Sequence, residues 1–183
     1  MKGGFLGAPI AVLVMLAMVA LSGPASAQVS KEYQIKAVFL WRLAQFTHWP
    51  AEAFDAPESP IVICVLGDNP FGDALEAAVL GESAHGRKFV VQHHRSVERI
   101  KPCHILYMSG AGPRQAKAIV SALGGRSVLT VRDLDGIASA YDTIVGFVTE
   151  QNRIKLRINV KAAAAARLVF DSRLLRAAQV VED

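Results

Sequence analysis

The chain has 183 residues, 52% of them hydrophobic and 20% charged, and its formal net charge is +4. This composition indicates a chain built around a core, and the length suits one domain rather than several. The positive charge is small and spread along the sequence, so it does not indicate a nucleic-acid partner.

The first 27 residues are typical of a cleaved signal peptide. Lys2 gives a thin positive start, residues 5–21 are apolar, and residues 25–27 form an A-x-A cleavage pattern. The alternative is an uncleaved membrane anchor, but the apolar region is short for a membrane span. We therefore expect cleavage before Gln28, export to the periplasm, and one mature domain over residues 28–183 without a nucleic-acid partner.

Residues 61–66 are the stretch around which the predicted fold is organised. They form a continuous apolar run rich in β-branched residues, which is typical of a strand buried on both faces. A Gly-Asp pair ends the run, Asn69 is a good helix N-cap, and Pro70 suits a first helical position. The pattern predicts a strand, a sharp loop and a helix over 70–80. Ligands of α/β sheets usually bind at such loops.

The remaining elements follow in order. Helices are predicted over 30–48, 96–100, 113–123, 160–167 and 172–180, and further strands over 87–94, 103–109 and 127–131. Strands over 143–149 and 153–158 are so close in sequence that they predict an antiparallel hairpin. The predicted fold class is α/β: a single three-layer domain with a mostly parallel central sheet, an antiparallel edge hairpin and helices on both faces.

No stretch carries a known catalytic or cofactor pattern. The loop after residue 66 lacks the glycines of a dinucleotide site and the Lys-Ser/Thr pair of a P-loop. His93 and His94 are adjacent on a strand, so their side chains point to opposite faces and do not form one metal site. His85 and His104 are likewise expected at the surface or at strand ends. We predict a protein that is not an enzyme and holds no cofactor or metal.

Polar residues at the predicted carboxyl ends of neighbouring strands are candidates for binding a small ligand. They are Asp68, Asn69, Ser109, Arg132 and Asp133. Aspartates at such places more often cap helices and turns, and this alternative stays open.

The first predicted helix and the residues after it carry four large aromatic side chains within eleven residues. Core packing is the default role of such side chains, but Trp41 shares no face with the main apolar set of the helix. Because Trp is favoured at protein interfaces, we predict that Trp41, Phe46 and Trp49 contribute to an interface.

The two cysteines, Cys64 and Cys103, both fall in predicted core strands. An even count in an exported chain suggests one disulfide. Free buried cysteines are also common in core strands, so both states stay open at this point.

Six stretches, in the same order along the chain, resemble the YfiR-type family of periplasmic proteins. They are residues 36–50 (KAVFLWRLAQFTHWP), 61–75 (IVICVLGDNPFGDAL), 103–109 (CHILYMS), 124–138 (GGRSVLTVRDLDGIA), 144–163 (IVGFVTEQNRIKLRINVKAA) and 172–181 (SRLLRAAQVV). The resemblance covers essentially the whole mature chain. It implies that Cys64 and Cys103 pair, whereas the second cysteine pair of some members is missing here.

The resemblance also implies a function. The studied type of member is a periplasmic repressor that binds the periplasmic sensor domain of an inner-membrane diguanylate cyclase, which keeps cyclic-di-GMP and biofilm formation low. It further implies homodimers and sequestration by an outer-membrane lipoprotein. The alternative from another class is a periplasmic small-solute binding protein, with the five strand-end residues above as its ligand contacts.

Overall fold

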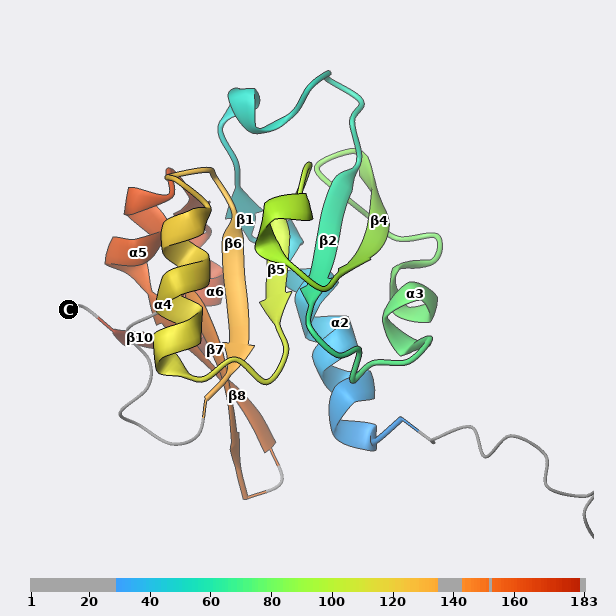
Figure 1. Ribbon diagram of the computed structural model, residues 1–183, viewed down its shortest axis with the longest axis vertical. Coiled ribbons are helices and arrows are strands. Elements are labelled where there is room, and N and C mark those ends of the chain that lie inside the picture. The colour runs from blue at the N-terminus through green and yellow to red at the C-terminus, as the bar shows by residue number, and fades with distance from the viewer. Residues whose placement is uncertain (1–28, 135–142, 152, 182–183) are drawn as a thin grey trace, which may run out of the picture.

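A mixed β-sheet runs through the centre of the computed structural model, with helices on both of its faces (Figure 1). The structure describes residues 29–134, 143–151 and 153–181, so the predicted signal peptide lies outside the described residues. The helices are α2 (Lys31–Gln45), α3 (Ala74–Val79), α4 (Pro113–Ala122), α5 (Val160–Ala165) and α6 (Ser172–Ala177), with short 3-10 turns η1 (Ala51–Ala53) and η2 (Val97–Arg99). The strands are β1 (Thr47–His48), β2 (Ile61–Leu66), β3 (Ser83–Ala84), β4 (Arg87–His94), β5 (Ile105–Met108), β6 (Leu129–Asp133), β7 (Val145–Glu150), β8 (Arg153–Asn159), β9 (Val169–Phe170) and β10 (Gln179–Val181).

The main sheet has eight strands in the order β10-β8-β7-β6-β5-β2-β4-β3, and β1 pairs with β9 in a separate two-stranded sheet. Within the main sheet, neighbours are parallel except for β7 with β8 and β3 with β4. The predicted α/β class, with a mostly parallel sheet and an antiparallel hairpin, is therefore confirmed.

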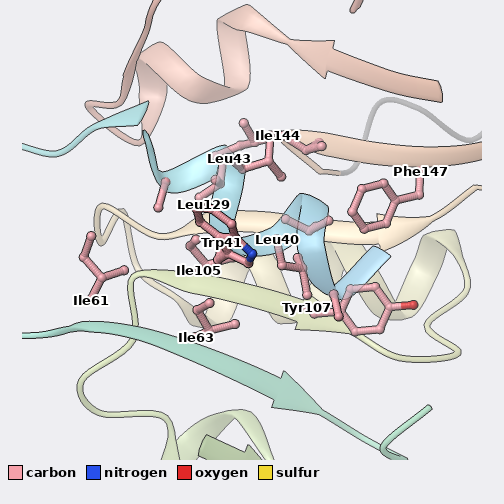
Figure 2. Close-up of a cluster of buried hydrophobic side chains, with 14 of the residues drawn as sticks. Leu40, Trp41, Leu43, Ile61, Ile63, Ile105, Tyr107, Leu129, Ile144 and Phe147 are labelled. Carbon is pink, nitrogen blue, oxygen red and sulfur yellow. The ribbon is translucent and has the colours of Figure 1, made fainter. Parts of the chain in front are cut away.

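Strand β2 separates two hydrophobic clusters, and all six of its residues are buried. Ile61, Ile63 and Val65 belong to the cluster that includes Leu40 and other residues of α2 (Figure 2). The residues between them in β2, Val62, Cys64 and Leu66, belong to a second cluster, which includes buried residues of α4. Because successive side chains of a strand point to opposite faces, one apolar run supplies both layers of the core.

The C-terminal edge of the sheet differs from the prediction. The sequence places the hairpin at the sheet edge and a helix over 172–180, but α6 ends at Ala177 and the chain continues as β10. This strand pairs in parallel with β8 and forms the edge outside the hairpin. Three residues are too few to show a strand period in the sequence, and only pairing with β8 distinguishes them from a helix end.

The helix after β2 begins later than predicted, at Ala74 rather than near Pro70. Asn69 does not cap a helix at that point. Its Oδ1 accepts the Phe71 N–H over 3.0 Å, and its Nδ2 donates to the Gly72 carbonyl over 2.9 Å. Its side chain therefore closes a turn in the loop, which is the other common use of asparagine in such positions.

Trp41 lies in the hydrophobic core. The prediction that Trp41 shares no face of α2 with the main apolar residues is therefore wrong. Its exposed fraction is 7%, and its ring packs edge-on against Phe89 of β4 with centroids 6.3 Å apart. Because β4 contacts α2 in addition to the central strands, the buried face of this helix is wider than its apolar spacing indicates.

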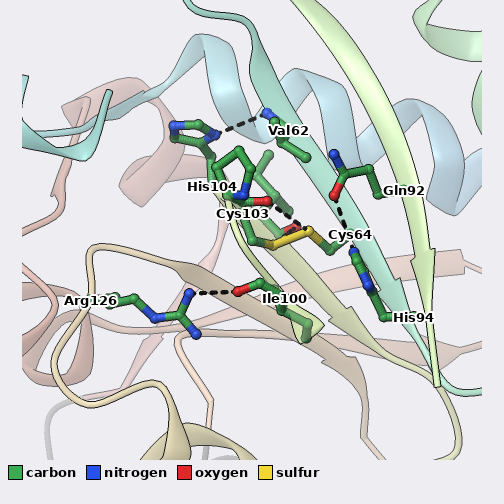
Figure 3. The surroundings of a disulfide bond; sticks show 10 residues. Val62, Cys64, Gln92, His94, Ile100, Cys103, His104 and Arg126 are labelled. Atoms are coloured by element: carbon green, nitrogen blue, oxygen red, sulfur yellow. Dashed lines mark hydrogen bonds between the residues drawn. A yellow bond between two sulfur atoms is a disulfide. The ribbon is translucent and has the colours of Figure 1, made fainter. Parts of the chain in front are cut away.

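Cys64 and Cys103 form a disulfide on the α4 side of the sheet (Figure 3). Their Cα atoms are 6.0 Å apart, and the bond joins β2 to the segment just before β5 across a sequence separation of 39. The structure thus holds the disulfide that the cysteine count suggests, between two parallel neighbours of the central sheet.

Replacing both cysteines with alanine (Cys64→Ala, Cys103→Ala) should lower the free energy of unfolding by about 2–4 kcal/mol, because the unfolded chain regains the entropy that the cross-link removes. Equilibrium urea unfolding, followed by Trp fluorescence, measures this difference. Reductant should move the wild-type midpoint toward that of the double variant and leave the variant unchanged. Equal midpoints for oxidised wild type and double variant would contradict a stabilising role for the bond.

Candidate functional site

Asp133 is the centre of a polar cluster at the carboxyl ends of the central strands. It is the last residue of β6, and its Oδ2 accepts hydrogen bonds from the hydroxyls of Tyr107 on β5, over 2.8 Å, and Tyr33 on α2, over 3.0 Å. Its other oxygen, Oδ1, lies 2.8 Å from Nζ of Lys36. Both carboxylate oxygens of Asp133 are therefore engaged by neighbouring elements.

The polar cluster continues to the first turn of α2 and to β7. Lys36 also pairs with Glu32, one turn earlier, and Glu32 accepts a hydrogen bond of 2.8 Å from the Thr149 hydroxyl. Although it is charged, Lys36 is only 3% exposed. A buried ammonium group needs such partners, because its desolvation alone costs several kcal/mol.

The pKa shifts in the cluster show how its members depend on one another. Burial lowers the pKa of Lys36, but the hydrogen bonds to Asp133 and Glu32 outweigh burial, so the net pKa is raised. Burial and the nearby Asp133 charge raise the pKa of both Tyr107 and Tyr33. At neutral pH Lys36 is therefore a cation, and the two tyrosines are neutral hydrogen-bond donors.

These contacts fasten the N-terminal half of α2 to the ends of β5 and β6. The cluster uses its donors and acceptors on one another, so its role is to position the helix. Sequence reasoning identified only Asp133, because the partner residues Tyr33 and Lys36 lie about one hundred positions away. The available signal was the i,i+3 spacing of these two residues, which places them on the same face of the helix.

The other four predicted ligand residues do not join this cluster. Asp68 and Asn69 lie exposed in the loop after β2, and Ser109 follows β5 beside that loop, with its N–H donating to the Leu66 carbonyl over 2.9 Å. Arg132 is buried and donates from Nη1 to the Ala111 carbonyl over 3.4 Å. Because Arg132 and Asp133 are adjacent on one strand, their side chains point to opposite faces of the sheet. Ligand binding by these residues stays a prediction.

Phe46, one of the predicted interface residues, lines a surface groove of about 550 Å³ between α2, β8 and α6. The groove has an apolar floor that includes Ile154 and Leu174, and Arg42, Lys155 and Arg173 also line it. We call this hollow the α2–β8–α6 groove. It combines aromatic and arginine side chains, both of which are enriched at protein interfaces.

Trp49 lies beside the buried His104, at the opposite end of β2 from the polar cluster. The centroids of the Trp49 and His104 rings are 6.3 Å apart, and the two rings meet edge-on. The Phe54 ring stacks on the His104 ring, with centroids 4.4 Å apart. The Trp49 Nε1 is buried and has no acceptor within the described part of the chain. An interface role for Phe46 and Trp49 stays a prediction.

His104 is 2% exposed and lies directly before β5, so it is a buried strand-end histidine and not a surface one. The Val62 N–H donates to its Nδ1 over 3.0 Å (Figure 3). Nε2 therefore carries the proton and donates to the Ala53 carbonyl over 3.0 Å. These two bonds tie the start of β2 to η1. Burial lowers the pKa of His104, and the bond to Ala53 only partly opposes this shift.

Within residues 29–134, 143–151 and 153–181, no three His, Cys, Asp or Glu side chains are grouped so that they could hold a metal ion. None of the helices in the same ranges is long and apolar enough to cross a membrane.

The fold is that of a single-domain α/β protein. Its polar cluster around Asp133 is satisfied internally, and grooves lie on its surface between helices and sheet. The family model described as YfiR/HmsC-like matches residues 33–179. The chain therefore belongs to the YfiR/HmsC-like family, which is periplasmic, regulatory and non-catalytic. A comparison with curated proteins found no significant match.

The Lys36→Met variant should lose about 2–3 kcal/mol of unfolding free energy, because the substitution leaves the Asp133 carboxylate without its cation in a partly buried site. Urea unfolding measures the loss, and Lys31→Met, at an exposed position of the same helix, should change stability by less than about 0.5 kcal/mol.

A double-mutant cycle with Asp133→Asn isolates the pair. The double variant should be more stable than the sum of the two single losses predicts, since the second substitution removes the charge that the first leaves unpaired. Strictly additive losses would contradict the coupling between Lys36 and Asp133.

His104 should make the protein less stable as the pH falls below about 6.5, the pKa of histidine in an unfolded chain. Its pKa is lower in the folded state, so the unfolded chain binds the proton first and stability decreases until the pH passes the folded-state pKa. Unfolding free energies at pH 7.5 and 5.5 measure this loss, which should be smaller in His104→Gln.

The matched control for this pH dependence is His94→Gln. The pKa of His94 is also lowered, first by burial and then by His93, but this side chain is more exposed than that of His104. The His94→Gln variant should therefore keep most of the wild-type pH dependence. An unchanged pH dependence in His104→Gln would show that other groups cause it.

Proposed function

We propose that this chain is a periplasmic repressor that binds the periplasmic sensor domain of an inner-membrane diguanylate cyclase and holds the cyclase inactive. Low cyclic-di-GMP and reduced biofilm formation follow from that binding. The observation that carries the proposal is the match of the YfiR/HmsC-like family model to residues 33–179. The predicted signal peptide, with cleavage before Gln28, supports the same compartment.

The α2–β8–α6 groove is the surface that we assign to the cyclase. Its apolar floor suits an inserted apolar side chain of the partner, and its cations suit acidic residues around that side chain. The guanidinium of Arg42 lies 5.4 Å from the Trp41 ring, while Lys155 and Arg173 each pair with an acidic side chain of this chain. Arg42 is therefore the cation of this groove that we expect a partner to use most.

Repression also sets a thermodynamic condition. The protein must bind the inactive form of the cyclase more tightly than the active form, because equal affinity shifts no equilibrium. An affinity ratio of about one hundred, or roughly 2.8 kcal/mol, would turn an equal mixture of the two forms almost entirely inactive at saturation.

Two further partners belong to the same proposal. A homodimer would present two copies of the groove, related by a two-fold axis, to a dimeric sensor. An outer-membrane lipoprotein that competes for the repressor would release the cyclase by lowering the concentration of free repressor.

Reversing the charge of Arg42 (Arg42→Glu) should weaken binding to the periplasmic domain of the cyclase by about tenfold or more, because a rim cation becomes a repelling anion. In cells that lack the wild-type gene, the variant should leave cyclic-di-GMP close to the level without any repressor. Calorimetry with the purified cyclase domain and cellular cyclic-di-GMP measurements test the two statements.

Arg114→Glu is the matched control, since Arg114 is an exposed arginine on α4 that does not line this groove. It should repress as the wild type does. If both variants repress normally, the assigned surface is wrong while the function stands. If deletion of the gene leaves cyclic-di-GMP and biofilm unchanged in several growth conditions, the function itself is wrong.

A further inference from the structure

A second groove, of about 460 Å³, lies between α4 and α5 over the start of β6. We call it the α4–α5 groove; it shares no lining residue with the α2–β8–α6 groove. Its walls and floor are mostly aliphatic, and none of the described residues that line it is aromatic or acidic. The described lining residues are Lys117, Val120, Ser121, Leu123, Gly125, Arg126, Val128, Thr130, Thr143, Ile144, Ala162, Ala165 and Ala166.

The small side chains of α5 explain why this space is open. Ala162, Ala165 and Ala166 line one wall, opposite Val120 and Leu123 at the end of α4. Alanines leave room where larger aliphatic residues would close the contact between the two helices. The volume lies within the range of small-molecule sites, about 300–1,000 Å³.

The threonine hydroxyls in the floor of the groove already form hydrogen bonds with backbone groups of the protein. Thr130 Oγ1 accepts the Ile144 N–H over 3.0 Å, and Thr143 Oγ1 donates to the Val145 carbonyl over 3.3 Å. Both threonines are buried. The floor therefore suits a hydrocarbon chain better than a polar ligand, because a polar group there would lose water without gaining an obvious partner.

Two cations, Lys117 and Arg126, line the groove as well. Arg126 is held in place by the Ile100 carbonyl, 2.7 Å from Nη1 (Figure 3), and by the Leu123 carbonyl, 3.1 Å from Nε. Lys117 is exposed on α4. A cation that is already fixed loses little side-chain freedom when an anion binds beside it.

The charge of the flanking sequence has one sign. Residues 99–132, which include α4, contain six basic and no acidic residues, and two of the six, Lys117 and Arg126, line the groove. Because Lys117 and Arg126 line the α4–α5 groove and none of its described lining residues is acidic, an anionic ligand is favoured there over a neutral or cationic one.

We propose that the α4–α5 groove binds one molecule of an aliphatic carboxylate, with its hydrocarbon chain along the alanines of α5 and its carboxylate beside Lys117 and Arg126. An aliphatic chain is favoured over an aromatic ring because the described lining offers no ring for stacking. This site is separate from the strand-end residues predicted for a small ligand, and it does not depend on the proposed regulation of a cyclase.

Isothermal titration calorimetry of the mature protein, purified from the periplasm, tests the proposal with monomeric decanoate as the probe. Decanoate should bind with one-to-one stoichiometry. Octanoate, two methylenes shorter, should bind roughly fifteenfold more weakly, because each buried methylene contributes about fourfold. Decanol and indole-3-acetate should both bind at least about tenfold more weakly than decanoate, since one lacks the charge and the other lacks the aliphatic chain.

Matched variants locate the site. Ala165→Leu should fill the groove and abolish binding, whereas Ala164→Leu, at the neighbouring exposed position that does not line the groove, should bind as the wild type does. Lys117→Glu should weaken decanoate binding about tenfold or more, whereas Lys161→Glu, on α5 outside the groove, should change it little. If Ala165→Leu fails to fold, Ser121→Phe fills the groove from the opposite wall.

Several outcomes would overturn the proposal. If Ala165→Leu and Ala164→Leu had equal effects, the ligand would bind elsewhere. If Lys117→Glu and Lys161→Glu had equal effects, decanoate would be attracted by the overall positive charge of this face and not by Lys117 in particular. Decanol binding as tightly as decanoate would remove the role of the cations. Binding to vesicles of anionic phospholipid without binding to monomeric decanoate would assign this face to a membrane surface instead.

Discussion

The contact between Lys36 and Asp133 is the constraint on which the arrangement of α2 depends. Each group is expensive to bury alone, so the helix can cover the sheet only where the ammonium meets the carboxylate. That requirement sets the position of α2 over β5 and β6. It thereby places Leu40 and Trp41 in the core and brings the end of the helix, with Phe46, to the α2–β8–α6 groove.

The longer strands of the central sheet were predictable because each contains an apolar run or an alternation of apolar and polar residues. β2 and β4 have the expected boundaries for that reason. The missed pairs, β1 with β9, β10 with β8 and β3 with β4, are two or three residues long, and the first two join segments that lie far apart in sequence. Nothing local distinguishes such segments from loops or helix ends, because their structure is decided by the partner strand.

The polar cluster shows the same limit at the level of single residues. The position of Asp133 after an apolar run correctly indicated a strand end, but two of its partners, Tyr33 and Lys36, come from α2. The burial of His104 was not predictable for the same reason, because its two backbone partners, Val62 and Ala53, belong to segments that only the fold brings together. Burial of a polar residue becomes predictable only when its partner is known.

The two grooves are linked through one continuous segment of the chain. Ile154 and Leu156 of β8 line the α2–β8–α6 groove, and β8 leads directly into α5, whose alanines line the other groove. At the junction, Asn159 caps α5 by accepting the Ala162 N–H over 2.8 Å. A ligand between α4 and α5 would change partner binding only if it bound more tightly to one of two arrangements of this segment, and the size of the change is limited by that difference in affinity. A ligand that fits both arrangements equally would stabilise the protein without altering its affinity for the proposed partner.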